Sequence, residues 1–115
     1  QTKMQMTVEC SLPSQSLNPQ ELVHVLQIVR EATLNAIKHS KGTLIEVKAH
    51  INAEGEYEIL VQDNGVGIPT LDEPEGHYGL NIMTERSRQL NAQLTISKGE
   101  QGGTIVKITL PHTFF

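Results

Sequence analysis

The stretch Asp63-Asn64-Gly65-Val66-Gly67-Ile68 follows directly after the β-rich run Tyr57-Glu58-Ile59-Leu60-Val61-Gln62. An acid at a strand end, followed by glycines at alternate positions, holds one carboxylate still while backbone passes close to a ligand. The pattern therefore favours a binding site. A hairpin turn at Asn-Gly is the alternative, but residues 66–77 contain Pro69, Pro74 and Gly76 and show no strand-like alternation for a return strand.

Length and composition limit the classes of protein that remain. The 115 residues fit one compact domain, residues 1–115, which is large enough to bury a core without disulfides or a structural metal. The single cysteine, Cys10, excludes an internal disulfide and is compatible with a reducing compartment. No run approaches the roughly 18 to 20 apolar residues of a membrane span, and no signal-peptide pattern opens the chain. The net charge of −4 argues against a nucleic-acid partner.

A strand and a long helix are predicted in the first third of the chain. Residues 3–10 alternate in polarity, with Met4, Met6 and Val8 on one side, as in a half-buried strand. Asn18-Pro19-Gln20-Glu21 then has the residues of a helix start, with Asn as N-cap and Glu answering it. The helix is expected to reach about Ser40, with Gly42 as C-cap. Helical spacing predicts a core face of Leu22, Val25, Leu26, Val29, Ala32, Ala36 and Ile37.

A polar stripe lies on roughly the opposite side of this helix. At about 100° per residue, an acid, an amide, an ammonium and an imidazole face the same space: Glu31, Asn35, Lys38 and His39. A solvated polar face is the alternative. Asn35 favours a functional site, because a mid-helix Asn is a poorer helix former than Glu, Gln or Lys.

The rest of the chain predicts a hairpin, a second helix and another hairpin. Residues 43–52 and 57–62 form the first hairpin, which ends at Asp63. The second helix is expected to begin near Gly79, where free N–H groups would favour phosphate, although an ordinary glycine entering a helix is the alternative. Strands at 93–97 and 104–110 flank a loop containing Gly102-Gly103, which a hairpin alone would also explain. The order predicts an α+β fold, a two-layer sandwich with helices on one face of a mixed sheet of about five strands.

Four ordered motifs carry a resemblance to a known family. They are Glu31-Ala32-Thr33-Leu34-Asn35-Ala36-Ile37-Lys38-His39-Ser40, Asp63-Asn64-Gly65-Val66-Gly67-Ile68, His77-Tyr78-Gly79-Leu80 and Gly102-Gly103-Thr104. The set resembles the N box, G1 box, G2 box and terminal glycine-threonine motif of the ATP-binding domain of sensor histidine kinases, in the superfamily that includes DNA gyrase B. Residues 35–40 and 77–86 are similar to the nitrate/nitrite sensor subfamily. The resemblance implies the Bergerat-type ATP-binding fold.

The resemblance also implies ATP and Mg²⁺ as ligands. Asp63 is expected to accept a hydrogen bond from the adenine amino group, and its carboxylate would repel the carbonyl of guanine. Asn35 is expected to offer its amide oxygen to Mg²⁺, with phosphate and water completing the shell. The side chains of Lys38 and His39 are expected to contact phosphate oxygens. The remaining cofactor-binding residues that the resemblance implies are Gly65, Gly67, Ile68, His77, Tyr78, Gly79, Leu80 and Thr104.

Several of these residues have more specific expected roles. Backbone N–H groups of Gly79 and Leu80 would cap the phosphates, and residues 69–78 would form a short movable lid that is not ordered without nucleotide. Thr104 would support Asp63 directly or through water. Glu31 is assigned a catalytic role: it activates water in hydrolytic relatives, whereas in the kinases an acid beside the accepting histidine serves as base and Glu31 would orient the nucleophile or a Mg²⁺-bound water.

None of the five histidines, His24, His39, His50, His77 and His112, lies in a context resembling a phosphate-accepting helix. We expect structural roles for His24 and His50. The chain begins at Gln1, and we expect it to be cut from a longer, homodimeric sensor of the bacterial inner membrane, whose cytoplasmic part also holds the dimerisation and phospho-acceptor domain and meets a response regulator. Alternatives are an ATPase, a serine kinase of the anti-sigma-factor sort, or a non-catalytic nucleotide-sensing module.

Overall fold

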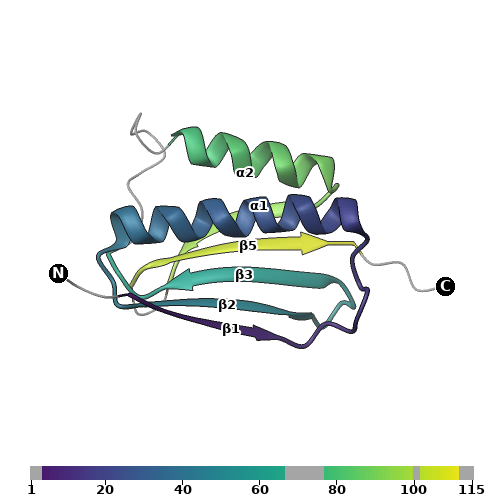
Figure 1. Ribbon diagram of the computed structural model, residues 1–115, viewed down its shortest axis with the longest axis horizontal. Coiled ribbons are helices and arrows are strands. Elements are labelled where there is room, and N and C mark those ends of the chain that lie inside the picture. Colours follow the sequence, from purple (N-terminus) through teal and green to yellow (C-terminus); the bar gives the residue numbers. More distant parts are fainter. Residues whose placement is uncertain (1–3, 67–76, 100–101, 112–115) are drawn as a thin grey trace.

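Two helices and five strands make up the part of the chain that the computed structural model describes, residues 4–66, 77–99 and 102–111. Both helices lie on one face of the sheet (Figure 1). The elements are β1 (Gln5–Cys10), α1 (Pro19–Asn35), the π-helical turn η1 (Ala36–Ser40), β2 (Leu44–Ile51), β3 (Tyr57–Asp63), α2 (His77–Gln89), β4 (Gln93–Lys98) and β5 (Thr104–Leu110). The predicted two-layer α+β fold is confirmed.

The sheet is mixed, as predicted, with the strand order β1-β2-β3-β5-β4. β1 pairs with β2 in parallel, and every other neighbouring pair is antiparallel. The central strand β3 alternates between buried and half-buried residues along its whole length. Its buried side faces the helices, so β3 carries both the middle of the core and, at its end, Asp63.

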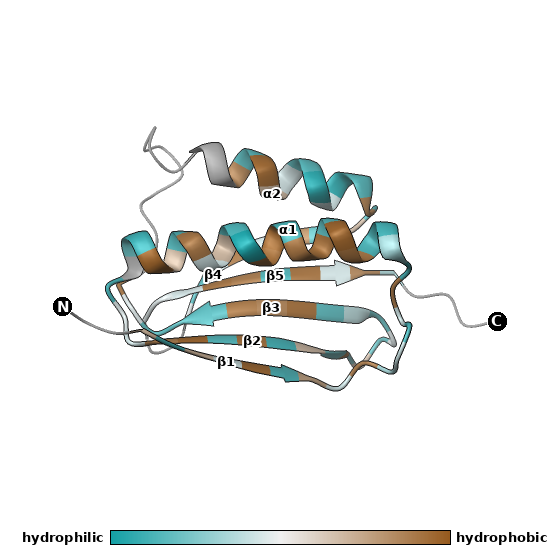
Figure 2. Cartoon of the chain, in the orientation of Figure 1, coloured by the Kyte–Doolittle hydropathy of each residue, from teal (hydrophilic) through white to brown (hydrophobic). Residues whose placement is uncertain are grey.

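The core lies between the helices and the covered face of the sheet. Figure 2 shows hydrophobic residues, in brown, along α1 and along the central strands. The fully buried side chains come from both layers: Ile28 of α1, Met83 of α2, Ile45 of β2 and Ile108 of β5. On α2, Met83 and Ser87 are buried and Leu80 packs against the core, and Leu90, directly after the helix, is also buried.

The start of α1 is the predicted capping box. The Asn18 side chain accepts from the Glu21 backbone N–H at 2.8 Å, and the Asn18 N–H donates to Glu21 Oε1 at 2.9 Å. Pro19 occupies the first turn, where its missing N–H costs nothing. Local sequence alone therefore fixes where this helix begins.

The end of the helix differs from the expectation that Gly42 is its C-cap. The last turn, η1, is π-helical, and the left-handed residue after it is Lys41, with φ 58°. Gly42 is needed for space instead. A Cβ on Gly42 would lie 2.5 Å from Asn64 Oδ1 and 2.8 Å from the Gly65 nitrogen.

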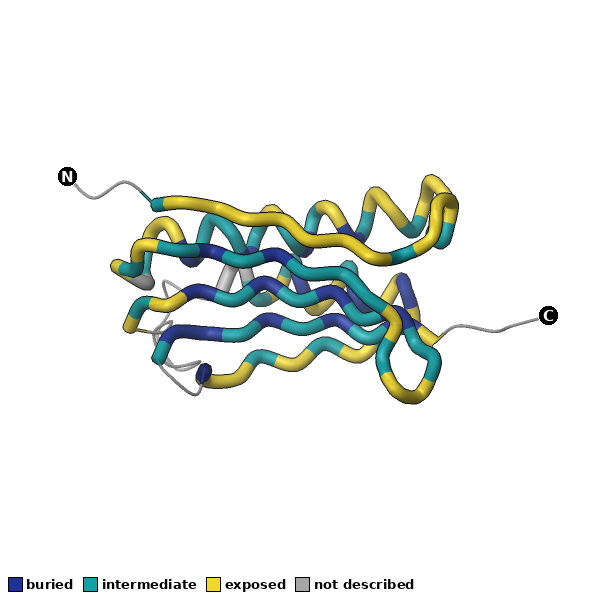
Figure 3. The backbone as a smooth tube through the Cα atoms, turned by 90° about the horizontal axis from the view of Figure 1, so that it is seen from below, coloured by how far each residue is buried: buried dark blue, intermediate teal, exposed yellow. Residues whose placement is uncertain are grey.

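The predicted core face of α1 is partly wrong. Val25, Ala32 and Ala36 are buried and Val29 packs against the core, but Leu22, Leu26 and Ile37 are exposed. The predicted half-burial of the first strand is also wrong, because Met6 and Val8 are 55% and 67% exposed. β1 is an edge strand of the sheet, and all of its residues are exposed (Figure 3).

Three further expectations can be compared with the structure. α2 begins at His77, two residues before Gly79, so this glycine lies inside the first turn. Asn64-Gly65 does not connect β3 to a hairpin partner, since β3 pairs with β2 and β5. Most of the predicted lid, together with Gly67, Ile68 and His112, lies outside the described residues.

Two of the histidines have side-chain partners. His50 Nε2 lies 2.7 Å from Glu58 Oε2 across the β2–β3 pair, and His24 Nδ1 lies 3.3 Å from Arg86 Nη1 across the two helices. Among the described residues, neither helix has the length and hydropathy needed to cross a membrane.

Replacing Asn18 with alanine is expected to lower the free energy of unfolding by about 1 kcal/mol, because the Glu21 N–H loses its acceptor. Urea denaturation of the chain measures this. Gln20→Ala, at an exposed position in the same turn, is the control and should change stability by less than about 0.5 kcal/mol. Equal losses in the two variants would refute the capping role.

Candidate functional site

The elements that carry the predicted site residues meet at one end of the molecule. The end of α1 with η1, the start of α2, the end of β3 and the start of β5 all lie at the left in Figure 1. Glu31, Asn35, Lys38 and His39 come from the first of these, and Asp63 and Thr104 from the two strands. Residues more than seventy positions apart in the sequence are thus brought to one place.

Asp63 is a buried carboxylate at the end of the central strand. Its residue is 5% exposed and is paired in register with the buried Ile45, on the side of the sheet that faces the helices. A buried charge requires hydrogen-bond donors. The Gly65 N–H donates to Asp63 Oδ1 at 2.9 Å, which fixes the carboxylate through the backbone that follows it.

Gly103 packs directly against Asp63. A Cβ on Gly103 would contact the Asp63 carbonyl oxygen and would lie 2.8 Å from Oδ1, and its φ of +79° is itself unfavourable for other residues. Gly102, with φ +97°, would bring a Cβ to 3.2 Å from the Gly65 carbonyl oxygen. The glycine pair is therefore more than a hairpin loop, because it lets the start of β5 close over the segment Asp63 to Gly65.

Thr104 follows Gly102 and Gly103 and is a buried polar residue, 5% exposed. It has an interaction partner within the protein. It is the first residue of β5, while Asp63 is the last of the neighbouring strand β3. The strand pairing thus brings Thr104 to the end of the sheet where Asp63 lies.

Asn64 has a structural role that the sequence pattern did not reveal. Its Oδ1 accepts from the backbone N–H groups of Thr43 at 2.9 Å and Leu44 at 3.0 Å, and its Nδ2 donates to Thr43 Oγ1 at 3.0 Å. These bonds tie the end of β3 to the segment that leaves η1. The available signal was Gly42, whose lack of a side chain makes room for Asn64.

The polar stripe of α1 is only partly turned toward solvent. Asn35 and His39 are half-buried, Lys38 is exposed, and the Glu31 side chain is 14% exposed with Arg30 Nη1 at 3.9 Å from its Oε2. The last two positions of the stripe lie in η1, whose i→i+5 bonding widens the helix. Such π-helical turns occur frequently at functional sites.

The first turn of α2, residues His77, Tyr78, Gly79 and Leu80, lies at the same end as this stripe. Backbone N–H groups in the first turn of a helix have no intrahelical acceptor, and the helix dipole favours an anion there. The described elements thus surround this end of the molecule with a buried acceptor at Asp63, an amide at Asn35 and the start of a helix.

Comparison with known proteins gives a consistent result. Residues 20–113 match the family model described as histidine kinase-, DNA gyrase B-, and HSP90-like ATPase. The chain is 79% identical over its whole length to the sensor protein NarQ homolog of Haemophilus influenzae, and 47% identical over 95% of its length to the nitrate/nitrite sensor protein NarQ of Escherichia coli. It spans about a fifth of these curated relatives, 20% and 19% of their lengths.

A solved structure has the same fold. The histidine kinase domain of the blue-light activated histidine kinase EL346 from Erythrobacter litoralis superimposes with a TM-score of 0.78 at 23% identity, over 96% of this chain and 52% of that one. The arrangement of helices and mixed sheet is therefore retained where most of the sequence differs.

We expect Gly103→Ala to destabilise the fold more than Gly55→Ala. Both glycines have nearly the same φ, 79° and 80°, so the cost of the left-handed backbone is shared. Only the new methyl at residue 103 contacts Asp63, which should add about 1 to 3 kcal/mol. Chemical denaturation of both variants measures the difference. Equal losses would mean that the contact with Asp63 relaxes at no cost.

Proposed function

Because the chain belongs to the family of histidine kinase-, DNA gyrase B- and HSP90-like ATPases, we propose that it binds Mg²⁺·ATP and donates the γ-phosphate to a histidine on a separate dimerisation domain. The observation that carries the proposal is the buried Asp63 carboxylate, held by the Gly65 N–H and approached by Gly103 without a side chain. The carboxylate is a hydrogen-bond acceptor held in place where the backbone of Gly65, after β3, and the backbone of Gly103, before β5, both approach it.

In this proposal Asp63 recognises the adenine base. A carboxylate accepts hydrogen bonds and cannot donate them, so it pairs with the adenine amino group and repels the guanine carbonyl. Its orientation is set by the Gly65 N–H before any ligand arrives. Gly65 offers backbone without a side chain to the base, with Gly67 and Ile68 following, and Thr104 supports the carboxylate from β5.

In this proposal the end of α1, together with η1, binds the phosphates. Mg²⁺, when bound, would supply positive charge that offsets the negative charge of the phosphates. Asn35 fits it as an amide oxygen ligand on a rigid helix, with phosphate and water as the other ligands. Lys38, exposed in η1, is free to reach a phosphate oxygen as a point charge, and the half-buried His39 lies beside it. Glu31 orients the attacking group.

The start of α2 completes the phosphate site. Backbone N–H groups of Gly79 and Leu80 cap the phosphates, helped by the positive end of the helix dipole. His77 and Tyr78 belong to the same turn and to the short lid that precedes it. In this scheme the segment between β3 and α2 closes over the nucleotide and excludes water.

The acceptor histidine is proposed to lie in another part of a longer protein. Two relatives are named as sensor proteins, one of them a nitrate/nitrite sensor, and this chain spans about a fifth of each. We therefore propose that this chain is a single donor domain of a homodimeric sensor kinase. It would lie on the cytoplasmic side of the bacterial inner membrane, with a response regulator as the onward partner.

Calorimetric titration with ATP, ADP and GTP in the presence of Mg²⁺ tests base recognition. The natural chain should bind adenine nucleotides in preference to GTP. Asp63→Asn should weaken ATP binding by about 10- to 100-fold, the value of a hydrogen bond to a charged group, and reduce the preference for adenine. Thermal unfolding without nucleotide controls for damage to the fold. Equal affinity of the natural chain for ATP and GTP would refute the proposal.

Phosphotransfer is tested separately, with radiolabelled ATP and a histidine-bearing dimerisation domain supplied from a relative. Asn35→Ala should abolish the Mg²⁺-dependent part of ATP affinity and reduce labelling of the acceptor by at least about 100-fold, as expected for a lost metal ligand. Gln20→Ala, at the other end of α1, is the matched control. ATP binding without labelling of any histidine would favour the nucleotide-sensing alternative.

A further inference from the structure

Asn64 lies between the two halves of the candidate site. It directly follows Asp63 at the end of β3, and its side chain bonds to the segment that joins η1 to β2. That segment, residues 41–43, follows directly after the turn that carries Lys38 and His39. Asn64 therefore links the proposed base-binding group to the turn that holds the proposed phosphate-binding side chains.

The carboxamide of Asn64 uses both of its polar atoms in this contact. Its Oδ1 accepts from the N–H groups of Thr43 at 2.9 Å and Leu44 at 3.0 Å, and its Nδ2 donates to Thr43 Oγ1 at 3.0 Å. The Asn64 backbone N–H donates to the Leu44 carbonyl oxygen at 3.3 Å. In a regular antiparallel pair the backbone carbonyl of residue 64 would accept the Leu44 N–H. The side chain takes over that role at the point where β3 ends.

The turn between η1 and β2 has a backbone conformation that needs such support. Lys41 is left-handed, with φ 58°, which a residue with a side chain rarely adopts by local preference. Gly42 comes next, and a Cβ on it would lie 2.5 Å from Asn64 Oδ1. The turn and the carboxamide are thus in close contact, and the contacts of the turn hold it in place.

We propose that Asn64 is a positioning residue, which holds η1 at a fixed place relative to Asp63 through its hydrogen bonds to Thr43 and Leu44. The inference rests on the proposed function of the site. With both halves fixed, the phosphates reach Lys38 when the base reaches Asp63. Without the bonds of Asn64, the ligand itself must order the two halves, and the cost of that ordering lowers its affinity. Asn64 need not contact the nucleotide for this effect.

Asn52 provides a matched control at the other end of the hairpin formed by β2 and β3. Its Oδ1 accepts from the N–H groups of Glu54 at 3.0 Å and Glu56 at 2.9 Å, and its Nδ2 donates to Glu56 Oε1 at 3.4 Å. These are the same kinds of bond that Asn64 makes, but they lie at the end of β2 away from η1. A substitution that only loosens the hairpin should therefore act alike at both positions.

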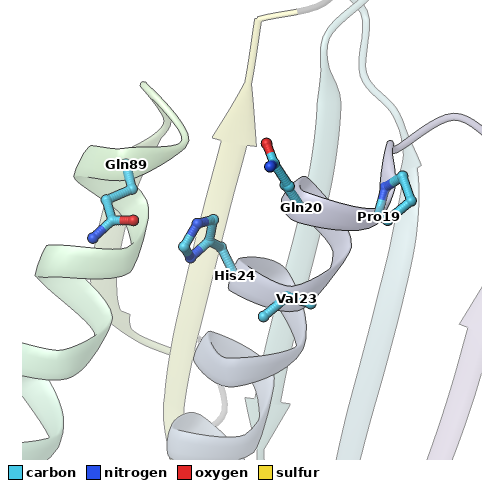
Figure 4. A pocket seen from close by; sticks show the side chains of 5 residues that line it. All are labelled: Pro19, Gln20, Val23, His24 and Gln89. Atoms are coloured by element: carbon cyan, nitrogen blue, oxygen red, sulfur yellow. The ribbon is translucent and has the colours of Figure 1, made fainter.

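An open groove between the two helices is separate from both asparagines. Figure 4 shows its lining side chains, which come from the first turns of α1 and the last turn of α2: Pro19, Gln20, Val23, His24 and Gln89. None of the proposed nucleotide-binding residues is among them. Substitutions at residues 64 and 52 therefore leave the lining of this groove unchanged.

Hydrogen exchange of the chain without nucleotide tests the positioning directly. Asn64→Ala should speed exchange at the amides of η1 and residues 41–44 by about 3- to 10-fold, the value of one hydrogen bond. Asn64 and Thr43 are exposed, so water can bond to the freed groups and the fold should persist. Thr43→Val, which removes only the hydroxyl acceptor, should give a smaller change in the same direction. Asn52→Ala should leave these amides unchanged.

A double-mutant cycle with ATP and Mg²⁺ tests the consequence for the site. Lys38→Ala should weaken ATP binding by about 10-fold or more in the natural chain, the value of a hydrogen bond to a charged group. When Asn64→Ala is also present, the further loss from Lys38→Ala should fall below about 3-fold, because η1 no longer holds the ammonium at the phosphates. In the Asn52→Ala background the full effect of Lys38→Ala should remain.

Equal losses from Lys38→Ala in the natural and Asn64→Ala chains would overturn the positioning role, and Asn64 would then only stabilise the hairpin. Faster exchange confined to residues 43 and 44 would overturn it as well. Absence of ATP binding by the natural chain, or no effect of Lys38→Ala in it, would count against the proposed function instead. The exchange rates of η1 would then decide the role of Asn64 by themselves.

Discussion

The candidate site depends on one steric constraint, the contact between the backbone of Gly103 and Asp63. The two residues lie so close that a single methyl group on Gly103 would overlap the Asp63 carbonyl oxygen. This approach lets β5 enter the sheet beside β3 while the carboxylate stays buried and bonded to Gly65. On the other side Asn64 ties the same segment to Thr43 and Leu44. The end of β3 is therefore fixed by both neighbouring strands before any ligand is bound.

Features encoded by neighbouring residues were predictable from the sequence. The capping box at Asn18, the hairpin ending at Asp63 and the strand at β5 depend on local pattern, and each is found where it was expected. The four motifs also carry the family resemblance, which the match of residues 20–113 to the family model confirms. How these residues act on a ligand stays a prediction.

Features that depend on which elements pack against one another were not predictable from the sequence. Leu22, Leu26 and Ile37 have the spacing of a core face, but all three are exposed. Periodicity reports which residues share a side, and it does not report whether a neighbour covers that side. The clamp by Asn64 was missed for the same reason, since its partners are about twenty positions away.

The sheet order also constrains how the molecule is assembled. β2 and β3 are joined by a short turn, whereas β5 reaches β3 only after α2 and β4 have been made. Local pairings close first because they cost less chain entropy. The hairpin can therefore form while the last strand is still on the ribosome, but Asp63, at the open end of this hairpin, is covered only when Gly103 and β5 emerge. A chain truncated before Gly103 would lack the buried β5 residues Val106, Ile108 and Leu110, and its Asp63 would lose the neighbouring strand that covers it.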